Sequence, residues 1–143
     1  MASGVASRAV VDTGPLVAMV RTREKAHGQC AATLKTLRAP LLTCWPVLTE
    51  AAWLLRAEPG GMKVMGRLIE SGLFKLAELD DTALAWIIDF MERYASAGAQ
   101  MADAALMYLA EREGIDTVFT LDRRDFSVYR TTDGRALTIL PES

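Results

Sequence analysis

Histidine and cysteine are scarce in this chain of 143 residues, which contains one His and two Cys. The cysteines, Cys30 and Cys44, stand outside any CxxC pair, and His27 is the single histidine. These counts exclude a zinc finger and a disulfide scaffold. A pair of histidines acting as general acid and general base is excluded as well, so any hydrolytic chemistry must use other groups.

The chain also lacks an excess of charge of either sign. Lys and Arg number 16 against 18 Asp and Glu, which gives a formal net charge of −2. No global basic field therefore indicates a nucleic-acid partner. A bound polyanion would have to be held by a local basic patch or by metal ions.

A long uninterrupted apolar run is missing too. The longest apolar stretch, roughly residues 40–55, contains Thr43, Thr49 and Glu50, and the first residues, MASGVASR, include no long apolar segment. We therefore expect a soluble, cytoplasmic protein in a reducing compartment, with no signal peptide, membrane span or membrane partner. The length fits one domain and no repeat is visible, so we expect a flexible leader over residues 1–7 and a single domain over residues 8–143.

Short apolar runs alternate with helical patterns along the sequence. Strands are predicted at residues 9–11, 41–44, 74–79, 117–121 and 137–140, and helices after Pro15 and at residues 24–37, 46–55, 62–70, 84–91 and 103–113. Without tight hairpin signals, this alternation predicts an α/β domain with a mainly parallel sheet.

Four carboxylates lie at the edges of these apolar segments. Asp12 and Asp122 each follow a predicted strand, Asp103 lies in the first turn of a predicted helix, and Glu50 in the second turn of another. Because parallel sheets place ligands at the carboxyl ends of their strands, the four side chains are expected to converge. Glu50 has apolar neighbours along its helix and needs a partner or a metal if it is buried.

Converging carboxylates repel one another, and their pKa values rise unless a cation neutralises them. Oxygen ligands without His or Cys select hard cations, Mg²⁺ or Mn²⁺, which share their remaining positions with water and phosphate oxygens. The expected chemistry is phosphodiester hydrolysis by metal-activated water.

Four segments resemble the PIN-domain family, and more closely its VapC-like toxin branch: VVDTGPLVAMV (10–20), LLTCWPVLTEAAWLL (41–55), MADAALMYLAER (101–112) and VFTLDRRDF (118–126). The resemblance implies a three-layer α/β/α sandwich and a metal-dependent endoribonuclease. It carries over Asp12, Glu50, Asp103 and Asp122 as catalytic, metal-binding acids, and Asp125 as a further ligand candidate that competes with Asp122. Thr13 and Thr120 are implied as supporting hydroxyls, and a small VapB-like antitoxin, a homodimer and a structured RNA substrate as partners.

Other interpretations of the same residues stay open. Asp12 and Asp103 are also typical of turns and helix starts, and Asp122 and Asp125 could cap a turn or pair with neighbouring arginines. Arg123, Arg124 and Arg130 are candidates for RNA phosphate contacts, although charged loops are usually solvated surface.

Three tryptophans stand among aliphatic residues at helical spacing, which favours a place in the core or in a dimer interface over a base-stacking role. They are Trp45, Trp53 and Trp86.

Alternative functions are a PIN-type nuclease of RNA maturation or decay without an antitoxin, and a non-catalytic RNA- or protein-binding module. A haloacid-dehalogenase-like phosphatase is less favoured, because it needs an acid two residues after the first Asp, where this chain has Gly14.

Overall fold

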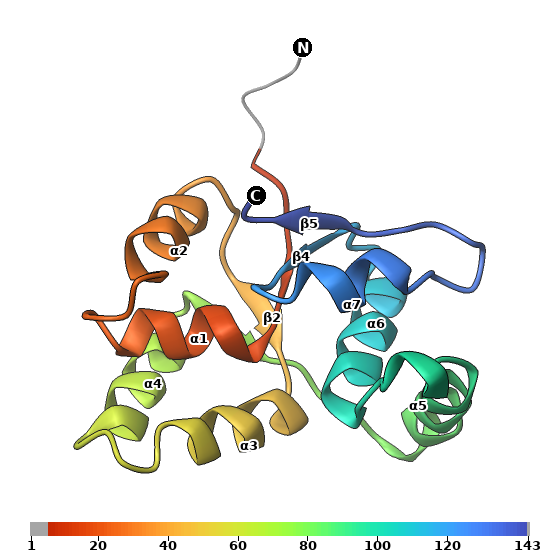
Figure 1. The fold of residues 1–143 in the computed structure, drawn as a ribbon, viewed down its shortest axis with the longest axis horizontal. Coiled ribbons are helices and arrows are strands. Elements are labelled where there is room, and N and C mark those ends of the chain that lie inside the picture. The colour runs from red at the N-terminus through yellow and green to blue at the C-terminus, as the bar shows by residue number, and fades with distance from the viewer. Residues whose placement is uncertain (1–5, 143) are drawn as a thin grey trace.

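A five-stranded parallel sheet forms the centre of the molecule, in a computed structural model that describes residues 6–142 (Figure 1). The strand order is β3-β2-β1-β4-β5, so the chain moves outwards from β1 in one direction and then returns to continue in the other. The strands are β1 (Val10–Val11), β2 (Leu41–Thr43), β3 (Phe74–Leu76), β4 (Thr117–Phe119) and β5 (Thr138–Leu140). All four pairings are parallel, which brings the carboxyl ends of the strands to one edge of the sheet.

Helices cover both faces of this sheet (Figure 1). One layer contains α1 (Thr13–Val20), α2 (His27–Leu34), α3 (Trp45–Leu54) and α4 (Gly61–Glu70). The other contains α5 (Asp81–Arg93), α6 (Met101–Glu113) and α7 (Arg123–Val128), with the short 3-10 helix η1 (Ala95–Ala97) after α5. The predicted three-layer α/β/α sandwich is thus confirmed.

Local sequence signals explain where the helices begin and end. Asp12 and Asp80 cap α1 and α5 through side-chain oxygens that accept backbone N–H bonds. Pro46 lies in the first turn of α3, where its missing N–H costs no hydrogen bond. Gly114 ends α6 with a φ of 67°, a left-handed conformation that favours glycine.

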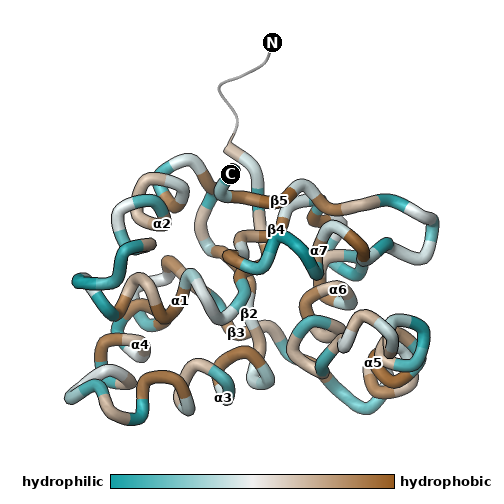
Figure 2. The backbone as a smooth tube through the Cα atoms, viewed as in Figure 1, coloured by the Kyte–Doolittle hydropathy of each residue, from teal (hydrophilic) through white to brown (hydrophobic). Residues whose placement is uncertain are grey.

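The core is continuous and lies between the sheet and its two helical layers. Hydrophobic stretches lie along the central strands and also along helices such as α3 and α4 (Figure 2). One hydrophilic stretch nevertheless lies near the middle of the view, where the chain passes from β4 into α7. Among the described residues, no helix has both the length and the apolar character needed to cross a membrane.

The structure differs from the sequence prediction in several elements. The helix expected at residues 24–37 is shorter, because residues 21–26 form turns before His27, and α7 and η1 were not predicted. Trp45 and Trp53 are 65% and 63% exposed, so a place in the core is wrong for both. Residues 1–5 of the expected leader lie outside the described residues, and the Ser7 carbonyl accepts a hydrogen bond from the Arg38 N–H at 2.8 Å.

Candidate active site

Five acids from four elements line one small cavity at the carboxyl edge of the sheet. Its volume is about 190 Å³, and its lining consists of Asp12, Glu50, Gly98, Gln100, Asp103, Asp122 and Asp125. The predicted convergence therefore occurs. A more open hollow of about 610 Å³ adjoins this cavity and shares Asp12, Glu50 and Asp122 with it.

Asp12 is held by two hydroxyl-bearing residues that the sequence also singled out. Its Oδ1 accepts the Thr13 N–H at 2.8 Å, and its Oδ2 accepts the Thr120 hydroxyl, also at 2.8 Å. The same Thr120 oxygen accepts the Asp122 N–H at 2.9 Å. Thr120 thereby joins the segments after β1 and β4, which are far apart in the sequence.

Gly14 allows these two segments to approach each other. A Cβ atom at this position would lie 3.2 Å from the Leu121 Cβ, closer than most side-chain contacts. A side chain at this position would require Leu121 to shift by a few tenths of an ångström. Gly14 lies in the first turn of α1, and its missing side chain serves the close packing of the two segments.

Asp103 is half-buried in the first turn of α6 and accepts two hydrogen bonds on a single oxygen. The Tyr129 hydroxyl donates to Oδ2 at 2.8 Å, and the Gln100 N–H donates to the same atom at 3.5 Å. Sequence reasoning missed Tyr129 and Gln100. The only signal for Tyr129 was its position three residues after Phe126, which is the spacing of an apolar helix face.

The acids also fulfil the structural roles that formed the alternative interpretation. Asp12 caps α1, and the Gln100 contact ties Asp103 to the start of α6. Asp122 caps α7, and its Oδ1 accepts the Asp125 N–H at 3.2 Å. The same side chains therefore stabilise helix starts and line the cavity, so the structural and the functional interpretations of these acids are compatible.

The electrostatics of the cavity disfavour several ionised carboxylates together. Burial raises the pKa of Asp12 to about 6 and outweighs the hydrogen bonds from Thr120 and Thr13, which lower it; the charges of Asp103 and Glu50 add smaller upward contributions. Burial, followed by the neighbouring acids, also raises the pKa values of Glu50 and Asp103. The pKa of Asp125 rises through desolvation and its hydrogen bond and charge interaction with Asp122. A cation would lower the pKa of every one of these groups.

A hard divalent cation fits the donor set. All donors are carboxylates, which suits Mg²⁺ or Mn²⁺ better than softer metals. Within residues 6–142, however, no three His, Cys, Asp or Glu side chains are arranged closely enough to enclose a metal ion. Mg²⁺ usually takes one or two carboxylates and keeps several waters, so an open arrangement suits it.

Glu50 and Asp122 are exposed at the mouth of the cavity, whereas Asp12 is buried at its base. Glu50 therefore needs no buried partner. Asp122 borders both hollows and the half-buried Asp125 borders the small cavity alone. Both remain candidates for the fourth ligand.

The three arginines proposed for RNA lie in different surroundings. Arg123 and Arg124 line the larger hollow beside the acids. Arg123 also donates to the Ile139 and Pro141 carbonyls, while Arg130 donates to the Ser127 and Tyr129 carbonyls and is absent from both hollows.

An apolar groove of about 570 Å³ adjoins the acids on the side of α3. It is lined by Trp45, Pro46, Thr49, Glu50, Trp53, Gln100, Met101 and Ala102. The two tryptophans and Met101 are exposed. Exposed apolar surface of this kind marks contact sites for other molecules.

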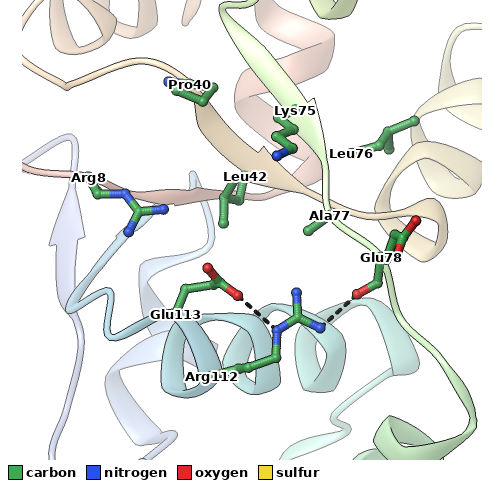
Figure 3. A pocket seen from close by; sticks show the side chains of 9 residues that line it. All are labelled: Arg8, Pro40, Leu42, Lys75, Leu76, Ala77, Glu78, Arg112 and Glu113. Carbon is green, nitrogen blue, oxygen red and sulfur yellow. Dashed lines mark hydrogen bonds and ion pairs between the residues drawn. The ribbon is translucent and has the colours of Figure 1, made fainter.

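Another hollow, of about 400 Å³, has a basic character and no share in the acidic cavity (Figure 3). Arg8, Lys75 and Arg112 border it, together with Glu78 and Glu113. Arg112 donates to the Glu78 carbonyl at 2.7 Å and pairs with Glu113 at 2.9 Å, as the dashed lines in Figure 3 mark.

Comparison with known proteins gives a match over most of the chain. A family model described as the PIN domain matches residues 9–131. Ribonuclease VapC26 of Mycobacterium tuberculosis is 27% identical over 134 residues, which cover 92% of this chain and 99% of that protein.

Two crystal structures have the same fold at low sequence identity. VapC20 of Mycobacterium tuberculosis, described as a Sarcin-Ricin loop cleaving toxin, matches with a TM-score of 0.73 and 16% identity, covering 82% of this chain and 92% of its own. PAE2754 from Pyrobaculum aerophilum matches with a TM-score of 0.50 and 20% identity, covering 92% of this chain and 91% of its own.

Proposed function

The chain belongs to the PIN domain family, and we propose that it is a Mg²⁺- or Mn²⁺-dependent endoribonuclease, the toxin of a VapBC-type toxin-antitoxin pair. The observation that carries this proposal is the cavity lined by Asp12, Glu50, Asp103, Asp122 and Asp125. The similarity to ribonuclease VapC26 over nearly the whole chain supports it.

In this proposal the acids hold the cation, and their positions define where RNA is cut. Asp12 supplies the most buried carboxylate, and Thr13 and Thr120 keep it in place. Glu50 and Asp122 stand at the mouth, where a phosphodiester can approach from the larger hollow. A bound cation would lower the pKa of the attacking water and stabilise negative charge on the leaving oxygen.

RNA phosphates would also need positive charge outside the cavity. Arg123 and Arg124 lie on the wall of the larger hollow and are the arginines best placed for this contact. Arg130 is the weakest of the three candidates, because it borders neither the larger hollow nor the acidic cavity.

The proposal includes a small VapB-like antitoxin and a homodimer, for which the VapC relative is the support. The exposed apolar groove beside Trp45, Trp53 and Met101 is the surface available to such protein partners. A neighbouring gene for a small protein with a DNA-binding segment and an amphipathic tail would favour the toxin over a nuclease of RNA maturation.

Cleavage of structured RNA by the purified protein tests the proposal. We expect Mg²⁺ or Mn²⁺ to support cleavage, EDTA to stop it, and Asp12→Asn to abolish it while the variant stays folded. Mn²⁺ should also raise the melting temperature of the wild type, because a ligand that binds only the native state stabilises it. Equal cleavage by wild type and Asp12→Asn would show the site to be wrong. Absence of both cleavage and a Mn²⁺ shift would favour the non-catalytic module.

A further inference from the structure

Tyr129 is the least exposed aromatic residue in contact with the acids. Its side chain has 0% exposure, and its hydroxyl donates to Asp103 Oδ2 at 2.8 Å across 26 residues of chain. A buried tyrosine hydroxyl normally finds a hydrogen-bond partner, and here the partner is a carboxylate that lines the acidic cavity. The contact therefore invites a functional explanation.

Three aromatic rings keep the Tyr129 ring from moving. Phe90, Tyr94 and Phe126 surround it with centroid distances of 5.1, 5.2 and 5.2 Å. All three contacts are edge-to-face, with interplanar angles of 69°, 70° and 80°. Such packing stabilises one ring orientation, so the hydroxyl stays at a fixed point beside Asp103.

The two carboxylate oxygens of Asp103 differ in the hydrogen bonds that they accept. Among the described residues, both donors to this carboxylate, Tyr129 and Gln100, reach Oδ2. The Gln100 contact is long, at 3.5 Å, so the tyrosine is the main constraint. Oδ1 accepts no hydrogen bond from the described residues, and since Asp103 lines the cavity, Oδ1 is the oxygen with full capacity for a ligand there.

We propose that Tyr129 is a positioning residue, which holds Asp103 by Oδ2 so that Oδ1 is presented to the divalent cation. This inference rests on the proposed function, because it takes the cavity to be the metal site. Hydrogen-bond partners of metal ligands orient those ligands, and their loss typically weakens metal affinity roughly 10- to 100-fold. Loss of the hydroxyl should therefore affect metal binding more than folding.

The test compares Tyr129→Phe with Tyr94→Phe, a matched control from the same aromatic cluster. The Tyr94 ring also contacts Phe90 and Tyr129, but its hydroxyl accepts the Arg130 N–H at 3.1 Å and touches no acid. Both variants keep the ring and lose one hydroxyl. Mn²⁺ affinity is measured on the full chain by electron paramagnetic resonance of free Mn²⁺, and RNA cleavage is followed across a Mn²⁺ titration.

We expect Tyr129→Phe to weaken Mn²⁺ binding at least about 10-fold, and Tyr94→Phe to leave it unchanged. Cleavage by Tyr129→Phe should recover to near the wild-type rate at saturating Mn²⁺, which separates a positioning role from general damage. Wild-type Mn²⁺ affinity in Tyr129→Phe, or equal losses in both variants, would overturn the inference and leave the proposed function standing. Failure of the wild type to bind Mn²⁺ would overturn both.

Discussion

The acidic cavity and the basic hollow of Figure 3 differ in how their charges are balanced. In the basic hollow, Arg112 pairs with Glu113 and donates to the Glu78 carbonyl. In the acidic cavity, none of the five carboxylates forms an ion pair with any residue in the described range 6–142. Their protein partners are neutral donors, such as the Thr120 and Tyr129 hydroxyls.

The contrast teaches that unbalanced charge, rather than size, distinguishes the proposed functional site from the other hollow. The basic hollow is the larger of the two, at about 400 Å³ against about 190 Å³. A fold keeps uncompensated carboxylates together only at a cost in stability, which a bound cation removes. The following experiments test this contrast, beginning with the largest expected effect.

Two exposed glutamates, one from each region, provide a matched pair. Glu50→Gln removes a proposed metal ligand from the mouth of the acidic cavity and should lower RNA cleavage roughly 100-fold or more, because the cation that it helps to hold would stabilise the transition-state charge. Glu113→Gln removes one from the basic hollow and should leave cleavage unchanged. Initial rates at fixed Mn²⁺ measure both. Similar cleavage rates for the two variants would show that the acidic cavity is no more important for cleavage than the basic hollow.

The burial of Asp12 predicts a pH-dependent stability in the metal-free protein. Because its pKa is raised from 3.8 to about 6, its favourable protonated form contributes stability below pH 3.8, and this contribution is lost as the pH rises through 6. Asp12→Asn removes the titratable group and with it this pH-dependent loss. The free energy of unfolding of the variant should therefore exceed that of the wild type above pH 6, by about 3 kcal/mol at most. Urea unfolding with EDTA at pH 4 and pH 7.5 measures the difference.

Asp80 is the control for this prediction. Its pKa is lowered by hydrogen bonds from Thr82, so its contribution is present above pH 3.8 and lost as the pH falls. Asp80→Asn should therefore show the opposite sign, as a small loss at neutral pH. A stability gain in Asp12→Asn that is equal at both pH values would contradict the assigned cause.

The smallest effect is expected in the basic hollow. Arg112→Met keeps the aliphatic stem and removes an exposed pair with Glu113, so the free energy of unfolding should fall by less than about 1 kcal/mol. RNA cleavage should not change, since Arg112 lies outside the acidic cavity. Chemical denaturation and the cleavage assay check both points. A clear loss of cleavage would mean that this hollow contacts RNA, which would weaken the contrast between the regions.

Sequence reasoning predicted the parallel sheet and the convergence of the acids, because both follow from local patterns. Asp12 and Asp122 follow strands, and parallel strands share an edge. Tyr129 was not predictable in this way, because it lies just after α7 and its partner, Asp103, lies 26 residues away in α6. The exposure of Trp53 was missed for a related reason, since helical spacing does not tell which apolar face is covered.

The surroundings of the arginines near the site were equally unpredictable from the sequence. Arg123 and Arg130 are alike in the sequence, but Arg123 donates to carbonyls at β5 and lies on the wall of the larger hollow, whereas Arg130 donates to carbonyls at the end of α7 and borders neither hollow. The orientation of a long side chain depends on which carbonyls lie within reach. That information exists only in the folded chain.

The hydrogen bond from Thr120 to Asp12 joins residues that lie 108 positions apart. Contacts of such long range form late in folding, because a large loop must close first. During synthesis on the ribosome, the chain carries Asp12, Glu50 and Asp103 well before Asp122, Asp125 and Tyr129 have been added. The order of translation therefore delays the assembly of the cavity until these last residues have been added.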